Sequence, residues 1–273
     1  MAARRHDIGD FLVFLRKVRE TPCYPWEPFT HQGRVAHNAR WYAQRGEKVR
    51  AEAARRGIRI PPTWSDVDAA GMYPVLCTGI YEVPGFEPRG TVVDVGAGYG
   101  DYAVLTARLP GVTEVVGLEP TAHSLSRARE FAELNAVHVR LIHAAGGAKS
   151  GSLRLGSAGT HAMSVLSVED AQEVAVVAVD DLPVPRIDFL KIDVEGAEGE
   201  VLRGAERTLS EMKPRIAIEV HSRALAEGVD RFLSGFGYVL LHHDHGVRAS
   251  YPMDLVQNRF YGAGAPSPPS QVG

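Results

Sequence analysis

The chain has 273 residues, of which 45% are hydrophobic and 23% are charged, and its formal net charge is -3. This is the composition of an ordinary soluble globular protein, with room for one large domain and an appendage but not for a second catalytic domain. No run approaches the roughly eighteen apolar residues of a membrane helix, and the first ten residues lack the apolar segment of a secretion signal. We therefore expect a cytoplasmic protein.

The charge is unevenly distributed along the chain. Residues 1–60 carry thirteen Lys and Arg against six Asp and Glu, whereas residues 61–273 carry seventeen against twenty-seven. A basic N-terminal arm therefore precedes an acidic body. The two cysteines, Cys23 and Cys77, lie far apart and outside any metal-binding spacing, so we expect reduced thiols rather than a disulfide or a metal site.

Two amphipathic helices are predicted first, over residues 7–20 and about 33–56, because apolar residues recur there at helical spacing. The second helix has a basic opposite face, formed by Arg34, Arg40, Arg45, Lys48, Arg55 and Arg56. Such a face can bind phosphates or an anionic substrate, but charged helix faces are usually only solvated, and we favour the latter. Residues 60–89 are rich in proline and aromatic side chains and are predicted to form an irregular cover that could close over a ligand.

From Thr91 onwards, strands and helices alternate as in a doubly wound α/β protein. The predicted strands span residues 91–95, 114–118, 137–143, 162–168, 174–179, 187–192, 215–220, 237–242 and 254–261, and the predicted helices span about 100–109, 121–135, 197–211 and 223–234. A Gly/Ser-rich stretch, 146–160, separates two of the strands, and the tail 262–273 is predicted to be disordered because it lacks apolar periodicity.

The first predicted strand ends in the sequence TVVDVGAGYG, where Asp94 precedes three alternating glycines, Gly96, Gly98 and Gly100. Such a turn lets the backbone approach an adenosine-bearing cofactor closely. A dinucleotide turn of the G-x-G-x-x-G type would require a third glycine at the position of Asp101, whose carboxylate would repel a pyrophosphate. S-adenosylmethionine carries a sulfonium and an ammonium group and no phosphate, so we favour it over a nicotinamide cofactor.

Glu119 ends the second strand, where a carboxylate can accept hydrogen bonds from both ribose hydroxyls. A plain surface glutamate is the alternative.

The segment IDFLKIDVEGAE predicts a buried strand with Asp193 at its carboxyl end and a helix that starts near Gly196. Carboxyl ends of parallel strands are where ligands bind, so Asp193 and Glu195 are expected close to the glycine turn. Asp193 is a candidate general base, but it can equally bind the cofactor's ammonium group or cap the helix. Lys191 could orient a carboxylate, and Glu198 is interpreted as a first-turn acid of the helix.

The next strand, RIAIEVH, places Glu219 and His221 at the same sheet edge. His221 could deprotonate an acceptor near neutral pH, although a lone histidine is more often structural. Further on, His242, His243, Asp244 and His245 resemble metal-ligating residues, but neighbours on a strand point in opposite directions, so we favour a surface hairpin turn and predict no metal site.

Taken together, these motifs resemble the FkbM family of S-adenosylmethionine-dependent methyltransferases over residues 79–221, and KIDVEGAE is the most recognisable element. The resemblance implies a class I, Rossmann-like methyltransferase fold, with a mainly parallel seven-stranded sheet, and methyl transfer to a hydroxyl oxygen. It likens Asp94, Gly96, Gly98 and Tyr99 to the cofactor loop, Glu119 to the ribose ligand, the step from Ala144 to Gly146 to the adenine rim, and Asp193 and Glu195 to the residues beside the transferred methyl. With His221 from the strand analysis, the predicted catalytic set is Asp193, Glu195 and His221. The predicted cofactor-binding set is Asp94, Gly96, Ala97, Gly98, Tyr99, Gly100, Glu119, Pro120, Ala145 and Asp193.

We accordingly divide the chain into a basic helical extension and cover (1–78), a methyltransferase domain (79–261) and a tail (262–273). The expected activity is O-methylation of a small molecule, sugar or other secondary metabolite. An RNA methyltransferase is the alternative, suggested by the basic helix and by Trp41, Tyr42 and Trp64, which could stack on bases. A non-catalytic binding or assembly protein on the same fold is the alternative of another class, and a nicotinamide dehydrogenase is a minor one.

Overall fold

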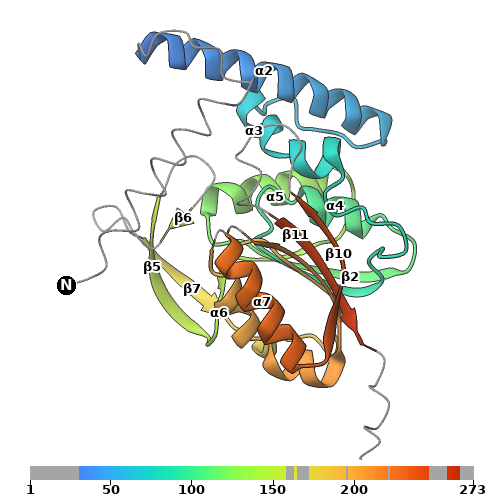
Figure 1. Cartoon of the computed structure of the whole chain (residues 1–273). Helices are drawn as coiled ribbons and strands as arrows, with labels where there is room; N and C mark the ends of the chain where they lie inside the picture. The colour runs from blue at the N-terminus through green and yellow to red at the C-terminus, as the bar shows by residue number, and fades with distance from the viewer. Residues whose placement is uncertain are drawn as a thin grey trace, which may run out of the picture.

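The computed structural model describes residues 31–157, 163–164, 172–194, 196–220, 222–245 and 257–264. A seven-stranded sheet in the order β10-β11-β9-β8-β1-β2-β3 forms its centre (Figure 1). The strands are β1 (Gly90–Val95), β2 (Val112–Leu118), β3 (Arg140–Ile142), β8 (Phe189–Ile192), β9 (Arg215–Val220), β10 (Tyr238–His245) and β11 (Gln257–Ala263). The five strands from β3 to β9 pair in parallel, and β11 is antiparallel to both of its neighbours. The predicted mainly parallel seven-stranded sheet is thus confirmed.

A smaller sheet in the order β4-β7-β5-β6 projects from the side of the molecule (Figure 1). Its strands are β4 (Ala145–Gly146), β5 (Gly151–Ser157), β6 (Met163–Ser164) and β7 (Gln172–Val177). β5 lies in the Gly/Ser-rich stretch for which no strand was predicted. It pairs with β7 in antiparallel fashion, and Ser152 Oγ donates to Glu173 Oε1 across the pair. Cross-strand pairing, rather than an alternating apolar pattern, holds this strand in place.

Helices cover both faces of the large sheet (Figure 1). One face carries α4 (Asp101–Ala107) and α5 (Ala122–Leu134), and the other carries α6 (Glu198–Arg203) and α7 (Arg223–Gly235). The helix predicted over 197–211 is interrupted: α6 ends at Arg203, and a π-helical turn, η3 (Thr208–Met212), follows. A 3-10 turn, η2 (Val179–Asp181), precedes β8.

The N-terminal extension forms an additional layer above α4 and α5 (Figure 1). It contains α2 (His31–Arg55), which matches the helix predicted over 33–56, followed by α3 (Asp66–Gly71) and the π-helical turn η1 (Pro74–Thr78). The predicted cover over 60–89 therefore contains two short helical segments. The helix predicted over 7–20 and the tail from residue 265 lie outside the described residues.

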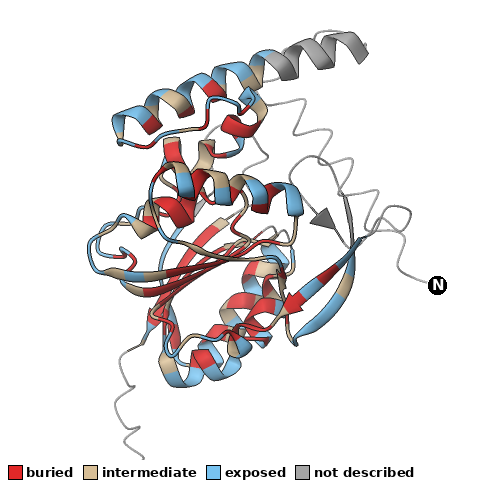
Figure 2. Cartoon of the chain, turned by 180° about the vertical axis from the view of Figure 1, so that it is seen from behind, coloured by how far each residue is buried: buried red, intermediate tan, exposed pale blue. Residues whose placement is uncertain are grey.

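The central strands of the large sheet, β1, β8 and β9, are buried between the helical layers (Figure 2). A separate apolar cluster joins the N-terminal layer to the sheet-covering helices, and Trp64 and Met72 pack there with Tyr99, Val104 and Phe131. Side chains from both sides of residue 78 share this cluster, so the division of the chain at that residue stays a prediction.

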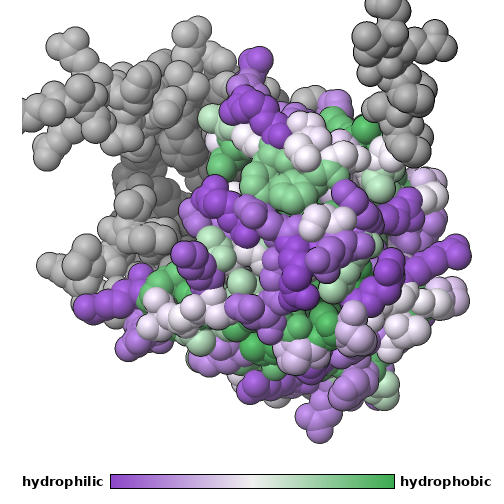
Figure 3. All heavy atoms as spheres, turned by 90° about the horizontal axis from the view of Figure 1, so that it is seen from below, coloured by the Kyte–Doolittle hydropathy of each residue, from purple (hydrophilic) through white to green (hydrophobic). Residues whose placement is uncertain are grey.

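On the face seen from below, hydrophilic side chains surround separate hydrophobic patches (Figure 3). The large hydrophobic residues that are exposed among the described ones, Val239, Leu240 and Leu241, belong to the edge strand β10. Among the helices that the structure describes, none combines the length and the apolar character that a membrane span requires.

Candidate cofactor and catalytic site

The glycine turn after β1 has a backbone shape that only glycine adopts easily. Gly96 and Gly98 have φ angles of +83° and +54°. A Cβ atom on Gly96 would lie 1.8 Å from the carbonyl oxygen of Asp193, so the first glycine lets β1 and β8 approach each other. A Cβ on Gly98 would meet no atom within 4 Å, so the backbone there faces open space.

Asp94 is completely buried at the carboxyl end of β1. Its Oδ1 lies 2.9 Å from Lys191 Nζ, and its Oδ2 accepts no hydrogen bond from the residues that the structure describes. Burial raises the pKa of Asp94, and the positive charge of Lys191 partly offsets that effect. A buried carboxylate oxygen without a donor is costly, so this side chain is suited to receive a donor or a cation from a ligand.

Lys191 connects the two strands that carry the carboxylates. Its buried ammonium group donates to Gly96 O at 2.8 Å and lies 3.6 Å from Asp193 Oδ2, in addition to its contact with Asp94. Burial acts to lower the pKa of Lys191, but the two carboxylates raise it above its ordinary value. The lysine is therefore a permanent cation that fixes both carboxylates, in line with its predicted orienting role.

Asp193 follows β8 and is bound by a side chain that sequence reasoning missed. Tyr81 Oη donates to Asp193 Oδ2 at 3.1 Å. Burial and the negative charge of Asp193 raise the pKa of Tyr81, so the phenol remains a donor. The only signal in the sequence was the position of Tyr81 in the aromatic-rich cover. The interpretation of Asp193 as a helix cap was wrong, because α6 begins at Glu198 and its N-cap, Ala197, has no side-chain hydrogen bond.

Glu119 follows β2 and is 5% exposed. Its two carboxylate oxygens accept hydrogen bonds from the backbone N–H groups of Gly98, at 2.9 Å, and Thr121, at 2.8 Å. Burial raises the pKa of this carboxyl. Glu119 therefore fixes the glycine turn from the β2 side, and each oxygen keeps a lone pair that a hydroxyl group can use.

The remaining predicted cofactor residues surround this turn. Ala97 and Tyr99 lie in the turn itself and are almost completely buried, and Gly100 is the N-cap of α4. Pro120 O lies 3.0 Å from His143 Nε2, and Ala145 begins β4 shortly after the end of β3. Because Glu119 N donates to Ile142 O, the end of β3 lies beside the end of β2. Ala145 thus follows the sheet edge where the carboxylates lie.

Asp101, the first residue of α4, is a further titratable group at this site. Burial raises its pKa to about 7, although Lys191 acts in the opposite direction. From its place in the sequence, Asp101 was predicted only to disfavour a dinucleotide.

Glu195 and His221 lie outside the described residues, so their predicted catalytic roles stay predictions. Glu198 is fully buried and accepts a hydrogen bond from Gly196 N at 2.9 Å, as expected for a first-turn acid.

The hairpin turn predicted at His242 was wrong, because residues up to His245 continue β10 and pair with β11. No group of three His, Cys, Asp or Glu side chains converges on a metal position within the described part of the chain.

The predicted basic face of α2 is partly neutralised by its own neighbours. Arg55 and Arg56 form ion pairs with Glu52, and Arg56 also pairs with Glu82. Arg45 stacks on the ring of Trp41 at 3.6 Å. Because these arginines already have partners within the chain, the contacts favour an ordinary solvated helix face over an anion-binding one.

The sequence profile of the family described as "Methyltransferase FkbM domain" matches residues 94–240, which is more than half of the chain. The chain belongs to the FkbM methyltransferase family. The matched region is therefore a methyltransferase domain, and its family uses S-adenosylmethionine as the methyl donor. The matched region begins at Asp94, near the end of β1, and includes β2 and β8; the carboxyl ends of these three strands carry the carboxylates described above.

One solved structure supports the class I methyltransferase fold, and two others are similar at lower TM-scores. The FkbM methyltransferase of Methylobacillus flagellatus KT is 18% identical with a TM-score of 0.50, and the match covers 79% of this chain and 58% of that one. An rRNA methylase from Streptococcus thermophilus is 13% identical with a TM-score of 0.46, covering 70% and 97%. A precorrin-6y C5,15-methyltransferase from Geobacter metallireducens GS-15 is 13% identical with a TM-score of 0.43, covering 77% and 95%. No significant match was found among curated proteins.

Proposed function

We propose that this FkbM methyltransferase transfers the methyl group of S-adenosylmethionine to a hydroxyl oxygen of a small molecule, a sugar or another secondary metabolite. The observation that carries the proposal is the set of carboxylates at the ends of β1, β2 and β8, with one fixed lysine among them. Three carboxylates against one cation favour a ligand that carries sulfonium and ammonium charges over a phosphate ligand.

We assign the cofactor site to the residues around the glycine turn. The free oxygen of Asp94 suits a donor on the methionine part of the cofactor, and the carboxylate of Glu119 suits the ribose hydroxyls. The backbone from Gly96 to Gly100 and the edge residues Pro120 and Ala145 complete the proposed site. The open space beside Gly98 supports this assignment, because it leaves room for a ligand that a side chain at this position would displace.

Bound S-adenosylmethionine would supply an electrophilic methyl group. The protein must then align the acceptor hydroxyl and remove its proton. Asp193 Oδ2 already accepts a hydrogen bond from Tyr81 and lies 3.6 Å from Lys191 Nζ, so both neighbours hold this carboxylate in place. We therefore assign to Asp193 the orientation of the acceptor hydroxyl or of the cofactor's ammonium group, and the base role stays a prediction for Asp193, Glu195 and His221.

A labelling experiment tests the proposed reaction. Purified protein is incubated with methyl-labelled S-adenosylmethionine and fractions of an extract from the source organism, and the labelled product is identified by mass. We expect an ether methyl on a low-molecular-weight product, and much less label with Asp193→Asn. Label that appears only on nitrogen, carbon or sulfur atoms would contradict O-methylation.

RNA is the second candidate acceptor, and the contacts of α2 reduce its support because several of its arginines are engaged within the chain. In the same assay, label in RNA fractions and RNA binding that weakens steeply with salt would favour this alternative.

A further inference from the structure

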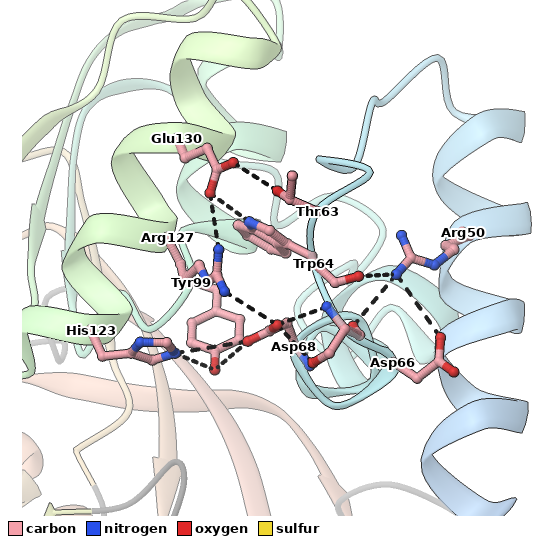
Figure 4. Close-up of polar contacts among 10 residues, drawn as sticks. Arg50, Thr63, Trp64, Asp66, Asp68, Tyr99, His123, Arg127 and Glu130 are labelled. Atoms are coloured by element: carbon pink, nitrogen blue, oxygen red, sulfur yellow. Dashed lines mark hydrogen bonds and ion pairs between the residues drawn. The ribbon is translucent and has the colours of Figure 1, made fainter.

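A polar cluster joins the N-terminal layer to the glycine turn (Figure 4). At its centre lies Asp68 of α3. Its Oδ1 accepts a hydrogen bond from Tyr99 Oη at 3.3 Å, and its Oδ2 accepts from Ser65 N at 2.9 Å and Ser65 Oγ at 2.7 Å. Arg127 of α5 lies 3.5 Å from the same Oδ2. One carboxylate therefore connects three segments that are far apart in the sequence.

Asp68 is held in a single place by its own helix. Ser65 and Asp68 form a capping box at the start of α3, in which each side chain bonds to the backbone of the other. The side chain of Asp68 is 10% exposed, and burial alone would raise its pKa, but the hydrogen bonds of Ser65 and the charge of Arg127 lower it. Asp68 is thus a fixed, ionised acceptor facing the turn.

Tyr99 is the residue between Gly98 and Gly100 in the turn. Tyr99 is 7% exposed. Its ring makes edge contacts with the rings of Trp64 and His123, at centroid distances of 5.5 Å and 6.0 Å. Both neighbouring glycines have positive φ angles, and glycine has more backbone freedom than any other residue. A turn of this composition needs an anchor to keep one conformation, and the buried tyrosine supplies it.

The turn is consequently held from two sides. Glu119 binds the N–H group of Gly98 from the sheet, and Asp68 binds the hydroxyl of Tyr99 from the N-terminal layer. Two adjacent residues are thus fixed by carboxylates that belong to different layers of the protein. Preorganisation of this kind raises ligand affinity because less conformational entropy is lost on binding.

We propose that Asp68 is a positioning residue, which holds the glycine turn through the hydroxyl of Tyr99 in the conformation that receives S-adenosylmethionine. The N-terminal layer then contributes to cofactor affinity without contacting the cofactor. This proposal rests on the assignment of the turn as the cofactor site.

Calorimetric titration with S-adenosylhomocysteine tests it in full-length variants. Tyr99→Phe removes the hydroxyl but keeps the ring, and Asp68→Ala removes the acceptor. We expect either change to weaken binding about 3- to 10-fold, the effect of one lost hydrogen bond. The double variant should bind as weakly as Asp68→Ala alone, because the tyrosine acts through the aspartate.

Glu130→Gln is the matched control. Glu130 accepts hydrogen bonds from Trp64 and Arg127 in the same interface, but none of its hydrogen bonds among the described residues reaches the glycine turn. We expect this variant to have a lower melting temperature and unchanged affinity. An equal loss of affinity in the control, or wild-type affinity in Tyr99→Phe, would overturn the proposal. If Asp68→Ala does not fold, Tyr99→Phe and the control still decide it. Failure of the unaltered protein to bind would instead refute the cofactor-site assignment.

Discussion

Lys191 is a buried cation between carboxylates of two strands. Its removal would leave Asp94 buried without a counter-ion, so the carboxyl would be either uncompensated or forced to take up a proton, and loss of one partner of a buried ion pair is strongly destabilising. For Lys191→Met we expect the free energy of unfolding to fall by about 3 kcal/mol, measured by denaturant titration. Lys149→Met, at an exposed position, should change it little. Similar free energies of unfolding for the two variants would show that Lys191 does not compensate the buried negative charge of Asp94.

The raised pKa of Asp101 predicts a pH-dependent stability. Its carboxyl has a pKa of about 7 in the folded protein and about 3.8 when unfolded, so between these values the folded state binds more protons than the unfolded state. The contribution of this group to stability is therefore present below about pH 4 and is lost as pH rises toward 7. Melting temperatures measured from pH 4 to pH 8 should fall more for the natural protein than for Asp101→Asn. Parallel profiles would contradict the shifted pKa.

The elements that could be predicted from the sequence are those whose apolar pattern agrees with their final burial. β1 and β9 are buried on both sides, and their continuous apolar runs predicted them within one residue. The same sheet edge was predicted to gather Asp94, Glu119 and Asp193, because the carboxyl ends of parallel strands meet there. These residues are indeed connected through Lys191 and the glycine turn.

Elements held by tertiary contacts were missed. The strand β5 lies in a Gly/Ser-rich stretch and depends on its pairing with β7, while the histidines after Leu241 were interpreted as a turn although pairing with β11 extends β10. Tyr81 was missed because its partner, Asp193, lies 112 residues away. Such contacts leave no local pattern in the sequence.

Alanine substitutions at the first two glycines of the turn should have different effects on stability and on cofactor binding. A Cβ at Gly96 would clash with the backbone of Asp193, whereas a Cβ at Gly98 would enter open space at a positive φ angle. We expect Gly96→Ala to lower the melting temperature strongly. Gly98→Ala should cost only about 1 kcal/mol, the penalty for this backbone region, but should weaken S-adenosylhomocysteine binding. Scanning calorimetry and titration of both variants would measure the two effects. Equal stability losses, or intact binding by Gly98→Ala, would contradict this account.

At the scale of the whole molecule, the N-terminal layer shares its core with the fold that it covers. Removal of residues 1–78 would expose Tyr99, Val104 and Phe131. We therefore expect the fragment 79–273 to lose the cooperative thermal transition of the full chain and to bind a hydrophobic dye. A fragment that unfolds as sharply as the full chain would instead support an independent methyltransferase domain that begins near residue 79.

In the proposed cofactor site, the buried carboxylate of Asp94 at the end of β1 helps to bind the methyl donor. Calorimetric titration of S-adenosylmethionine into the natural protein and into Asp94→Asn tests it most directly. A charged hydrogen bond contributes about 1.5–3 kcal/mol, so the account predicts an affinity roughly 10- to 100-fold lower for the variant, with its thermal transition retained. A folded Asp94→Asn protein that binds S-adenosylmethionine as tightly as the natural one would contradict the claim.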